Sequence, residues 1–313
     1  MSKIAIIGSG LIGQGWAAVF AQAEFEVAMY DVSPEAAGRA LSAMETRIAD
    51  LVEFDLVPAS DAVQVLQRIT VAATLDDALD GAIYVQENGP EDVHVKRQIT
   101  RSLDDLTATD VPIGSSTSGI TGSRYCEHVP GRHRCLVVHP INPPHLIPAV
   151  EIVPTPWTDK SVVKTVKDLM MRCRRETILL NEEIDGFVVN RLQGALLAEA
   201  LKLIGRGIVS ATDLDKAVCD GLGLRWSFMG PMQTIHLNAP GGVVDYVVRY
   251  GKMYRDFKIG YDEDIDWGHI AQEKLEAELT QRTPLDQISE AQVERDRRLM
   301  ALLRHKKLNA TNA

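Results

Sequence analysis

The stretch KIAIIGSGLIGQGWA at Lys3–Ala17, followed by EVAMYD ending at Asp31, decides the fold of the first part of this chain. The apolar run before the first glycine predicts a short buried strand. Glycines then follow in G-x-G-x-x-G spacing at Gly8, Gly10 and Gly13, and a helical pattern begins inside this motif. A strand, a glycine turn, a helix and a second strand in this order predict the opening of an α/β sheet.

Each part of the glycine motif has a physical task. Gly8 permits the sharp turn out of the strand, and Gly10 lets the backbone approach a pyrophosphate. Gly13 allows the helix to pack closely on the strand. The backbone N–H groups at the start of the helix, at Leu11 and Ile12, are free to receive the phosphate charge. The motif therefore predicts a dinucleotide-binding site.

The acidic residue at the end of the second strand indicates which dinucleotide is bound. A carboxylate at Asp31 can accept hydrogen bonds from the ribose hydroxyls of the adenosine half. The same negative charge repels a 2′-phosphate. We therefore expect the cofactor to be NAD rather than NADP.

The bulk properties of the chain exclude several classes of protein. With 313 residues, 45% hydrophobic and 24% charged, the chain has the length for two domains and the composition of a globular protein. A net charge of −10 argues against a nucleic-acid partner, which calls for a basic surface. It does not exclude a small anionic substrate, since one local arginine can outweigh the global balance.

Cysteine usage and hydropathy predict where the protein works. The four cysteines show no C-x-x-C pair or other metal-ligand spacing, so we expect no metal site and a reducing compartment. No apolar run is long enough to cross a bilayer, and the N-terminus enters a strand at once without a signal peptide. The chain is therefore predicted to be cytoplasmic, with no membrane partner.

Short apolar runs alternate with helical stretches through the first half of the chain. The candidate strands are Lys3–Ile7, Glu26–Tyr30, Ile69–Ala72, Ala82–Gln86, Pro112–Ser115, Arg134–Val138, Val150–Val153 and Glu176–Leu179. The candidate helices between them are Ile12–Ala23, Pro34–Glu53, Glu91–Leu106 and Ser161–Cys173. This alternation predicts a Rossmann-type, doubly wound parallel sheet with helices on both faces.

The pattern changes at Asp185, beyond which only helices are expected. Asp185 and Gly186 form a turn signal, and a long apolar stripe in helical spacing then runs from Val188 to Leu203. We therefore expect an NAD-binding domain over residues 1–184 and an all-α domain over residues 185–313.

Two polar residues stand where an open α/β sheet binds its ligands. Ser118 lies in a run of small residues after one candidate strand, and His139 comes directly after another. Ligands of such sheets sit outside the carboxyl ends of the strands. Both residues are therefore placed where chemistry is expected.

A stiff excursion follows His139 and can bring a carboxylate back to it. Four prolines crowd the segment before Glu151, so the segment is non-helical and can return as an extended strand. A carboxylate that binds one imidazole nitrogen fixes the tautomer and increases the basicity of the other. His139 is then a fitting general base for a hydroxyl proton, and Ser118 and Asn190 can hold the substrate oxygen.

Each of these residues also has a plain structural explanation. A histidine after a strand is more often a core or loop residue, and a strand glutamate such as Glu151 is more often solvated or in a salt bridge. A serine-rich loop around Ser118 is usually only a turn, and Asn190 can simply face solvent. Taken one at a time, the four residues leave structural and catalytic roles open.

Six stretches stand together in an order and spacing that match a known family. They are GSGLIGQGWA at Gly8–Ala17, QENGPEDVHVKR at Gln86–Arg97, SSTSGI at Ser115–Ile120, HPINPP at His139–Pro144, VEIVP at Val150–Pro154 and DGFVVNRL at Asp185–Leu192. Together they resemble the 3-hydroxyacyl-CoA dehydrogenase superfamily. The resemblance implies that His139 is the catalytic base, that Glu151 orients it, and that Ser118 and Asn190 contact the reacting oxygen.

The same resemblance suggests further cofactor contacts. Glu87, Lys96 and Asn142 are implied near the nicotinamide ribose or the substrate entrance. Ser116 is also a candidate contact, although the family usually carries Asn at that position, and this departure leaves its role open. The second domain is implied to bind substrate and to form a homodimer.

The stretch LDKAVCDGLGLRWSFMGPMQTIHLNAPGG at Leu214–Gly242 narrows the resemblance. It is similar to the branch that contains lambda-crystallin, which is L-gulonate 3-dehydrogenase, and L-carnitine dehydrogenase. This branch implies oxidation of the C3 hydroxyl of L-gulonate to 3-dehydro-L-gulonate, with NAD reduced to NADH.

Four residues of this stretch are candidate substrate contacts. Arg225 can pair with a carboxylate, Trp226 can cover one face of a sugar acid, and His236 and Asn238 can bind hydroxyls. The alternative is structural, with Arg225 bridging helices and Trp226 or Phe228 in the core. In a carnitine enzyme, Trp226 and Phe228 would instead enclose a quaternary ammonium.

Three alternatives to the gulonate reaction stay open at this stage. L-carnitine and a short-chain 3-hydroxyacyl-CoA ester are rival substrates, although no Lys/Arg cluster for the CoA phosphates is obvious in the sequence. A crystallin-like structural protein that binds NAD is the rival from a different class. The presence of Ser118, His139, Glu151 and Asn190 together favours an enzyme.

Overall fold

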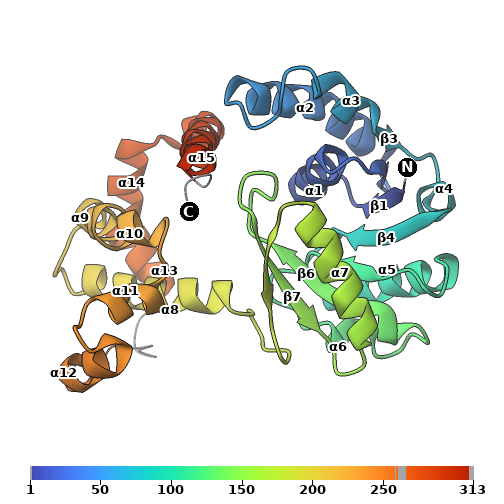
Figure 1. The fold of residues 1–313 in the computed structure, drawn as a ribbon. Helices are drawn as coiled ribbons and strands as arrows, with labels where there is room; N and C mark the ends of the chain where they lie inside the picture. The colour runs from blue at the N-terminus through green and yellow to red at the C-terminus, as the bar shows by residue number, and fades with distance from the viewer. Residues whose placement is uncertain (1, 258, 260–265, 310–313) are drawn as a thin grey trace. The chain divides into compact units, whose positions relative to one another are not determined.

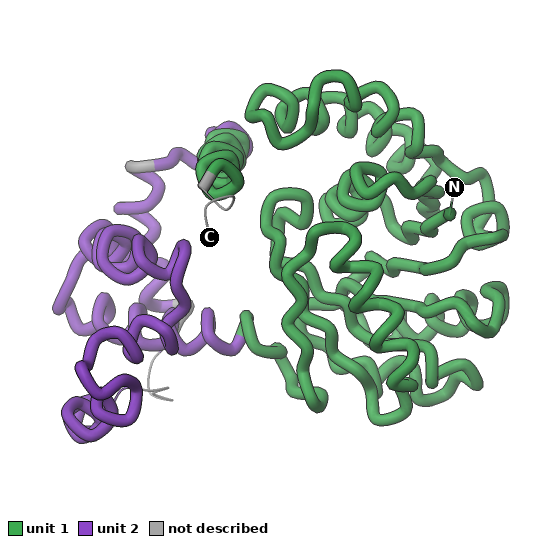
Figure 2. The backbone as a smooth tube through the Cα atoms, viewed as in Figure 1, with its two compact units in different colours: residues 1–190, 293–313 green, residues 191–292 purple. Residues whose placement is uncertain are grey.

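The structure is a computed structural model that describes residues 2–257, 259 and 266–309. The chain forms two compact units (Figure 2). Unit 1 contains residues 1–190 and 293–313, and unit 2 contains residues 191–292. The domain boundary predicted between residues 184 and 185 stays a prediction.

Unit 1 is built on one sheet of eight strands in the order β3-β2-β1-β4-β5-β6-β7-β8. Figure 1 shows this sheet with helices on its two faces. The strands are β1 (Lys3–Ile7), β2 (Glu26–Tyr30), β3 (Ile69–Val71), β4 (Ala82–Glu87), β5 (Ile113–Ser115), β6 (Cys135–Pro140), β7 (Ala149–Pro154) and β8 (Glu176–Leu179). All eight predicted strands are present, with ends shifted by at most a few residues. The predicted α/β fold class, with a Rossmann-type sheet and a helical C-terminal part, is confirmed.

One strand departs from the expected parallel sheet. β7 pairs with β6 in the antiparallel direction, whereas the other neighbouring strands pair in parallel. The physical reason is the length of the connection: residues 141–148 are too few for the crossover that two parallel strands need.

Helices cover both faces of the sheet. The helices of unit 1 are α1 (Leu11–Gln22), α2 (Pro34–Glu53), α3 (Ala62–Gln67), α4 (Leu75–Leu79), α5 (Val93–Leu106), α6 (Ser123–Cys126), the 3₁₀ turn η1 (Arg132–Arg134) and α7 (Lys160–Arg172). α15 (Ile288–Asn309) begins in unit 2 and continues into unit 1.

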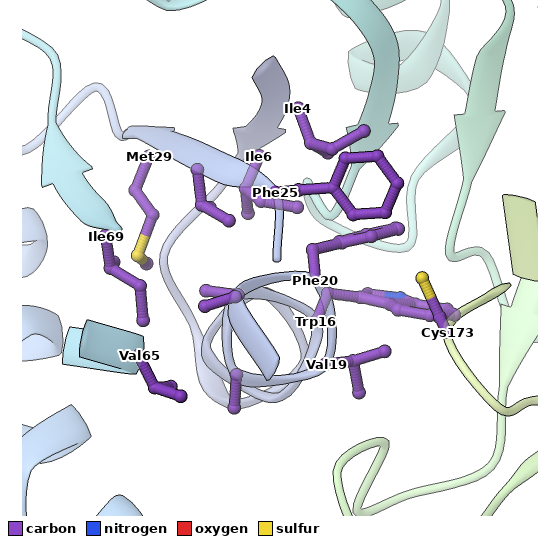
Figure 3. Close-up of a cluster of buried hydrophobic side chains, with 14 of the residues drawn as sticks. Ile4, Ile6, Trp16, Val19, Phe20, Phe25, Met29, Val65, Ile69 and Cys173 are labelled. Carbon is purple, nitrogen blue, oxygen red and sulfur yellow. The ribbon is translucent and has the colours of Figure 1, made fainter. Parts of the chain in front are cut away.

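The side chains of β1 point alternately to two separate cores. Ile4 and Ile6 belong to the cluster that contains residues of α1, α2 and α7 (Figure 3). Ala5 and Ile7 belong to the cluster that contains residues of α4, α5 and α6. Because successive strand residues face opposite sides, this alternation fixes the position of the loop that follows β1 between the two helical layers.

Unit 2 is helical throughout its described residues. Its elements are α8 (Val189–Gly205), α9 (Ala211–Lys216), the π-helical η2 (Ala217–Gly223), α10 (Leu224–Trp226), α11 (Pro231–Leu237), α12 (Gly242–Asp256), α13 (Trp267–Ile270), the π-helical η3 (Ala271–Leu275), α14 (Glu276–Arg282) and the 3₁₀ turn η4 (Leu285–Gln287). Its buried hydrophobic cluster is small and consists of Ile204, Ala211 and Ile270.

Two features are lacking from the described part of the chain. No helix there is long and apolar enough to span a membrane. No group of three or more His, Cys, Asp or Glu side chains there has the arrangement of a metal site. The cytoplasmic location stays a prediction.

Candidate active site

The glycine motif lies at the point where the strand order reverses, between β1 and β4. Gly8 has a φ of +92°, which a residue with a side chain rarely adopts. A Cβ atom on Gly13 would lie 2.0 Å from the carbonyl oxygen of Gly8, so only glycine permits this packing of helix on strand. A Cβ atom on Gly10 would meet nothing within 4 Å, so the backbone is open to a ligand there.

The first turn of α1 is suited to a phosphate group. Its N-cap residue is Gly10, which has no side chain to cap the helix, and the first turn carries no acidic residue. The side chain of Leu11 is 67% exposed. Backbone N–H groups and the positive end of the helix dipole are therefore available to an anion at Leu11 and Ile12.

Asp31 directly follows β2 and is tied to the glycine loop. Its Oδ2 accepts hydrogen bonds from the backbone N and the Oγ of Ser9, both at 2.8 Å, and its Oδ1 accepts one from the backbone N of Ser33 at 3.0 Å. Burial raises the pKa of Asp31, but these hydrogen bonds outweigh burial and lower the pKa overall. An ionised carboxylate beside the loop fits the ribose of NAD.

The predicted contacts Glu87 and Lys96 form a buried ion pair. Lys96 Nζ lies 3.0 Å from Glu87 Oε2, and the two side chains are 1% and 3% exposed. Glu87 Oε2 also accepts a hydrogen bond from Ser115 Oγ at 2.5 Å. Both charged groups are therefore satisfied within the protein, where they join the end of β4 to α5 and β5.

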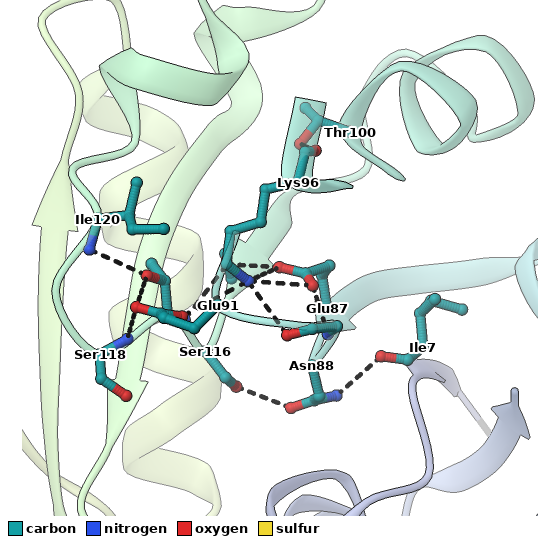
Figure 4. A network of polar contacts seen from close by, with 12 residues as sticks. Ile7, Glu87, Asn88, Glu91, Lys96, Thr100, Ser116, Ser118 and Ile120 are labelled. Atoms are coloured by element: carbon teal, nitrogen blue, oxygen red, sulfur yellow. Dashed lines mark hydrogen bonds and ion pairs between the residues drawn. The ribbon is translucent and has the colours of Figure 1, made fainter. Parts of the chain in front are cut away.

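Glu91 shapes the loop that carries Ser118 (Figure 4). Its Oε1 accepts hydrogen bonds from Thr117 Oγ1 at 2.7 Å, from the backbone N of Ser118 at 2.9 Å and from that of Gly119 at 3.0 Å. Its Oε2 lies 3.9 Å from Lys96 Nζ. The carboxylate thus holds Ser118 in place through the backbone while the residue itself stays exposed.

Ser116 connects three elements with its hydroxyl. It accepts hydrogen bonds from Trp16 Nε1 at 3.0 Å and from Gln86 Nε2 at 2.7 Å, and it donates one to Asn88 Oδ1 at 2.8 Å. One donated and two accepted bonds are the full capacity of a hydroxyl. The backbone N of Ser116 donates to the backbone oxygen of Glu87 at 2.8 Å, so a cofactor contact at Ser116 would use its backbone oxygen. Asn142, the remaining predicted cofactor contact, is exposed.

His139 and Glu151 face each other across the antiparallel pair β6 and β7. The two residues are partners in the strand register, and His139 Nδ1 lies 2.8 Å from Glu151 Oε2. Both side chains are buried, and the imidazole packs against the Phe187 ring with 5.4 Å between the ring centroids. With Nδ1 bound to the carboxylate, Nε2 is left as the nitrogen that can take up a proton.

The second oxygen of Glu151 is held by the start of α8. Oε1 accepts hydrogen bonds from the backbone N–H groups of Val188 at 2.7 Å and Val189 at 3.0 Å. Burial raises the pKa of Glu151, but the hydrogen bonds from His139 and from these two N–H groups outweigh it and hold that pKa below its usual value. The carboxylate is therefore ionised beside the imidazole.

Asn190, the next residue along, joins this pair to the Ser118 loop. Its Nδ2 donates a hydrogen bond to the backbone oxygen of Ser118 at 2.6 Å. Val188 and Val189 thus bind Glu151, and the next residue, Asn190, binds the Ser118 loop. The structure thereby connects the four residues Ser118, His139, Glu151 and Asn190, whose catalytic roles stay predictions.

The four candidate substrate residues lie in unit 2 on neighbouring elements. Arg225 and Trp226 are in α10, His236 is in α11, and Asn238 is the C-cap of α11. α10 contacts α11, and the Nδ1 of His236 accepts a hydrogen bond from the backbone N of Val243 at 3.3 Å. The side chain of Trp226 is 38% exposed, so it is not a core residue of this unit.

Three residues with clear structural roles were not predicted from the sequence. Ser9 orients Asp31, Glu91 holds the Ser118 loop, and Asn88 binds both Ser116 and the backbone oxygen of Ile7. Ser9 stands between two motif glycines, and Asn88 and Glu91 directly follow β4 at the edge of the sheet where ligands bind. These positions in the sequence could therefore have indicated that the three residues lie near the cofactor site.

Comparison with known proteins identifies both parts of the chain. Residues 3–183 match the family of the 3-hydroxyacyl-CoA dehydrogenase, NAD binding domain, and residues 186–282 match the family of the 3-hydroxyacyl-CoA dehydrogenase, C-terminal domain. The family predicted from the sequence and its cofactor, NAD, are confirmed.

Individual relatives cover nearly the whole chain. Lambda-crystallin of Oryctolagus cuniculus is 35% identical over 90% of this chain and 89% of its own length. L-carnitine dehydrogenase of Streptomyces coelicolor is 33% identical over 88% of this chain and 83% of its own length. Among solved structures, an NAD⁺-dependent dismutase, 5-formyl-3-hydroxy-2-methylpyridine 4-carboxylic acid 5-dehydrogenase, has a TM-score of 0.83 at 29% identity and covers 98% of this chain and 99% of its own.

Proposed function

The chain belongs to the 3-hydroxyacyl-CoA dehydrogenase family and is an NAD-dependent oxidoreductase acting on a CH–OH group, and we propose that it oxidises the 3-hydroxyl of a small polar hydroxy acid. L-gulonate, oxidised to 3-dehydro-L-gulonate, is the substrate that we place first. The observation that carries this proposal is the buried pair of His139 and Glu151, with 2.8 Å between Nδ1 and Oε2.

The pair has the arrangement of a general base and its positioning residue. In the proposed reaction His139 Nε2 removes the proton of the substrate hydroxyl while the carbon loses a hydride. The ionised Glu151 keeps the proton of the neutral imidazole on Nδ1 and stabilises the imidazolium that forms. NAD, when bound, accepts the hydride. The products are a ketone, NADH and one proton.

The chain's own residues also position the reactants. The Gly8–Gly13 loop, the start of α1 and Asp31 would hold the cofactor. The hydroxyl of Ser118 and the side chain of Asn190 would contact the substrate oxygen, and Glu91 would fix the Ser118 loop. Glu87 and Lys96 form a buried ion pair next to Glu91 and would support the Ser118 loop through it. Because both side chains are buried, the cofactor or substrate would have little direct contact with them.

The choice of substrate rests on unit 2. Arg225 is exposed and can bind a carboxylate with its guanidinium, while His236 and Asn238 can bind hydroxyls. A relative named lambda-crystallin, at 35% identity, supports the gulonate branch that the sequence resembles. Trp226 and the 74% exposed Phe228 support L-carnitine as the second candidate, because aromatic rings bind a quaternary ammonium.

A spectrophotometric panel separates these substrates. NADH formation is followed with L-gulonate, L-carnitine, L-3-hydroxybutyrate and 3-hydroxybutyryl-CoA under the same conditions. We expect the highest kcat/KM with L-gulonate. Brisk turnover of another member without turnover of L-gulonate contradicts the substrate assignment. Failure of all four, with NAD still bound, would favour a crystallin-like structural role.

We also propose that the protein is a homodimer formed through unit 2. α12 exposes several large apolar side chains, including Val244 at 72% and Val248 at 77%. The small buried cluster of this unit leaves such side chains without a core of their own. Light scattering should give twice the mass of the chain, and a Val244→Asp/Val248→Asp variant should give a monomer. A monomeric wild-type protein at micromolar concentration contradicts the proposal.

A further inference from the structure

A cavity with a volume of about 740 Å³ lies in unit 1 at the C-terminal end of α1. It is bounded by the end of α1, the connection from α2 to α3, α3 itself and the end of α7, with Lys307 of α15 at its rim. The cofactor loop lies at the opposite, N-terminal end of α1. Twelve helical residues separate the two ends by roughly 18 Å, so the cavity is a distinct site.

Basic side chains dominate the charge of this cavity. They come from three segments of unit 1 and are Arg68, Arg172, Arg174, Arg175 and Lys307, whereas the acidic lining residues are Glu24 and Asp61. Among the described residues, none of the five cations has a carboxylate within 4.0 Å, so their charges are not neutralised by ion pairs.

Four of these cations make contacts with neutral groups. Arg68 donates to the backbone oxygen of Ala21 at 3.0 Å, and Lys307 donates to that of Asp55 at 3.1 Å. Arg175 donates to the backbone oxygens of Cys173 and Pro144, both at 3.0 Å. The guanidinium of Arg172 stacks over the Phe25 ring at 4.1 Å. These contacts orient the side chains and leave their positive charge uncompensated.

Some other cations of the protein are paired. Lys164, Lys252 and Arg298 each pair with a carboxylate one helical turn away. The chain as a whole carries a net charge of −10, so a pocket with an excess of unpaired cations runs against its average. The excess of cations over carboxylates among the lining residues therefore gives the cavity a local positive charge.

We propose that this cavity binds a multivalent phosphate anion. Guanidinium groups bind phosphate oxygens in pairs, and several of them around one hollow match a ligand with several negative charges. The volume lies within the range of sites for small molecules, whereas an acidic protein or a membrane would need a broad basic surface. This proposal does not depend on the proposed substrate, because its test measures the binding of an anion and not turnover.

The probe is inorganic tripolyphosphate, titrated calorimetrically into the full-length protein at saturating NAD, which blocks the phosphate cradle at Gly10. An Arg172→Gln/Arg174→Gln variant removes two cavity charges. The matched control, Lys160→Gln/Lys167→Gln, removes two charges from exposed residues of α7 outside the cavity. We expect binding about tenfold weaker in the cavity variant and within about twofold of wild type in the control.

Two additional measurements make the result decisive. Thermal unfolding without the probe should give similar midpoints for the three proteins, which shows that the cavity variant is folded. A parallel titration with ATP identifies the source: tighter binding than tripolyphosphate points to a nucleotide, and equal binding points to inorganic phosphate. Equal weakening in both variants, or no binding of tripolyphosphate by the wild-type protein at millimolar concentration, overturns the proposal.

Discussion

Unit 1 and unit 2 differ in how completely each buries its own side chains. Unit 1 packs two large hydrophobic clusters on the faces of one sheet, and its polar residues form networks that are closed within the unit. Unit 2 buries only a small cluster and leaves many large apolar side chains exposed. A unit that is complete in itself can hold reacting groups rigidly, whereas one with open surfaces is suited to binding other molecules.

This difference assigns separate tasks to the two units. The cofactor loop, Asp31 and the pair of His139 and Glu151 all belong to unit 1, while the residues that we associate with substrate choice, such as Arg225, belong to unit 2. The chemistry should therefore depend on single residues of unit 1. Substrate choice and assembly should depend on surfaces of unit 2.

The largest effect is expected for a His139→Asn variant. Removing the general base should lower kcat by about 10³-fold, within the range found for general-base catalysis. The affinity for NAD, measured separately by fluorescence, should stay unchanged because His139 lies outside the glycine loop. Near-normal turnover would show that the chemistry of unit 1 does not depend on this residue.

A pair of alanine substitutions separates folding from cofactor binding in the glycine loop. Gly13→Ala places a Cβ atom 2.0 Å from the carbonyl oxygen of Gly8 and should lower the free energy of unfolding by about 3 kcal/mol. Gly10→Ala meets nothing within 4 Å and should leave stability nearly unchanged, while it weakens NAD binding about tenfold. Denaturation and NAD titration of both variants check this. If Gly13→Ala and Gly10→Ala lowered the free energy of unfolding equally, the packing role of Gly13 and the cofactor role of Gly10 would be contradicted.

A smaller effect is expected for Asp31→Ser. Without the carboxylate, the repulsion of a 2′-phosphate is lost, and the preference for NAD over NADP in kcat/KM should fall about tenfold. Because hydrogen bonds hold the pKa of Asp31 below its usual value, the carboxylate is charged at every pH above that value. The discrimination of the wild-type enzyme should thus be constant between pH 6 and pH 9. Unchanged discrimination in the variant would reject the ribose contact.

The smallest effect is a difference in reactivity between the cysteines of unit 1 and the cysteine of unit 2. Cys126, Cys135 and Cys173 of unit 1 are buried, and burial raises the pKa of Cys173 to about 12. Cys219 of unit 2 is exposed. Alkylation of the native protein, followed by mass spectrometry, should label Cys219 first. Protection of Cys219 would show that another surface covers it in the assembled protein.

Short-range patterns in the sequence predicted most of unit 1. The strand, the glycines, the helix and Asp31 lie within one stretch, so local spacing reveals their arrangement. The proline-rich segment likewise indicated that Glu151 returns to His139. The antiparallel direction of β7 and the binding of Glu151 by the start of α8 were not predicted, because they depend on how distant segments meet.

The remaining features had weaker signals in the sequence. Three of the cavity cations, Arg172, Arg174 and Arg175, are close in the sequence, but Arg68 and Lys307 are distant, so the sequence does not show that the five line one cavity. In unit 2, Arg225 and His236 were found only through a resemblance, since an arginine and a histidine on amphipathic helices have several ordinary roles. Long-range packing, and not the type of residue, decides what such side chains do.

Chemical rescue tests the central claim most directly, namely that His139 supplies the imidazole that takes the hydroxyl proton. A His139→Ala variant leaves a space beside Glu151 that added imidazole can enter. Turnover of the best substrate is measured against imidazole concentration, with the wild-type enzyme as control. We expect the variant to be nearly inactive and its rate to rise with imidazole, while the wild-type rate stays constant. Substantial turnover by the variant without imidazole would contradict the role of His139 as the base.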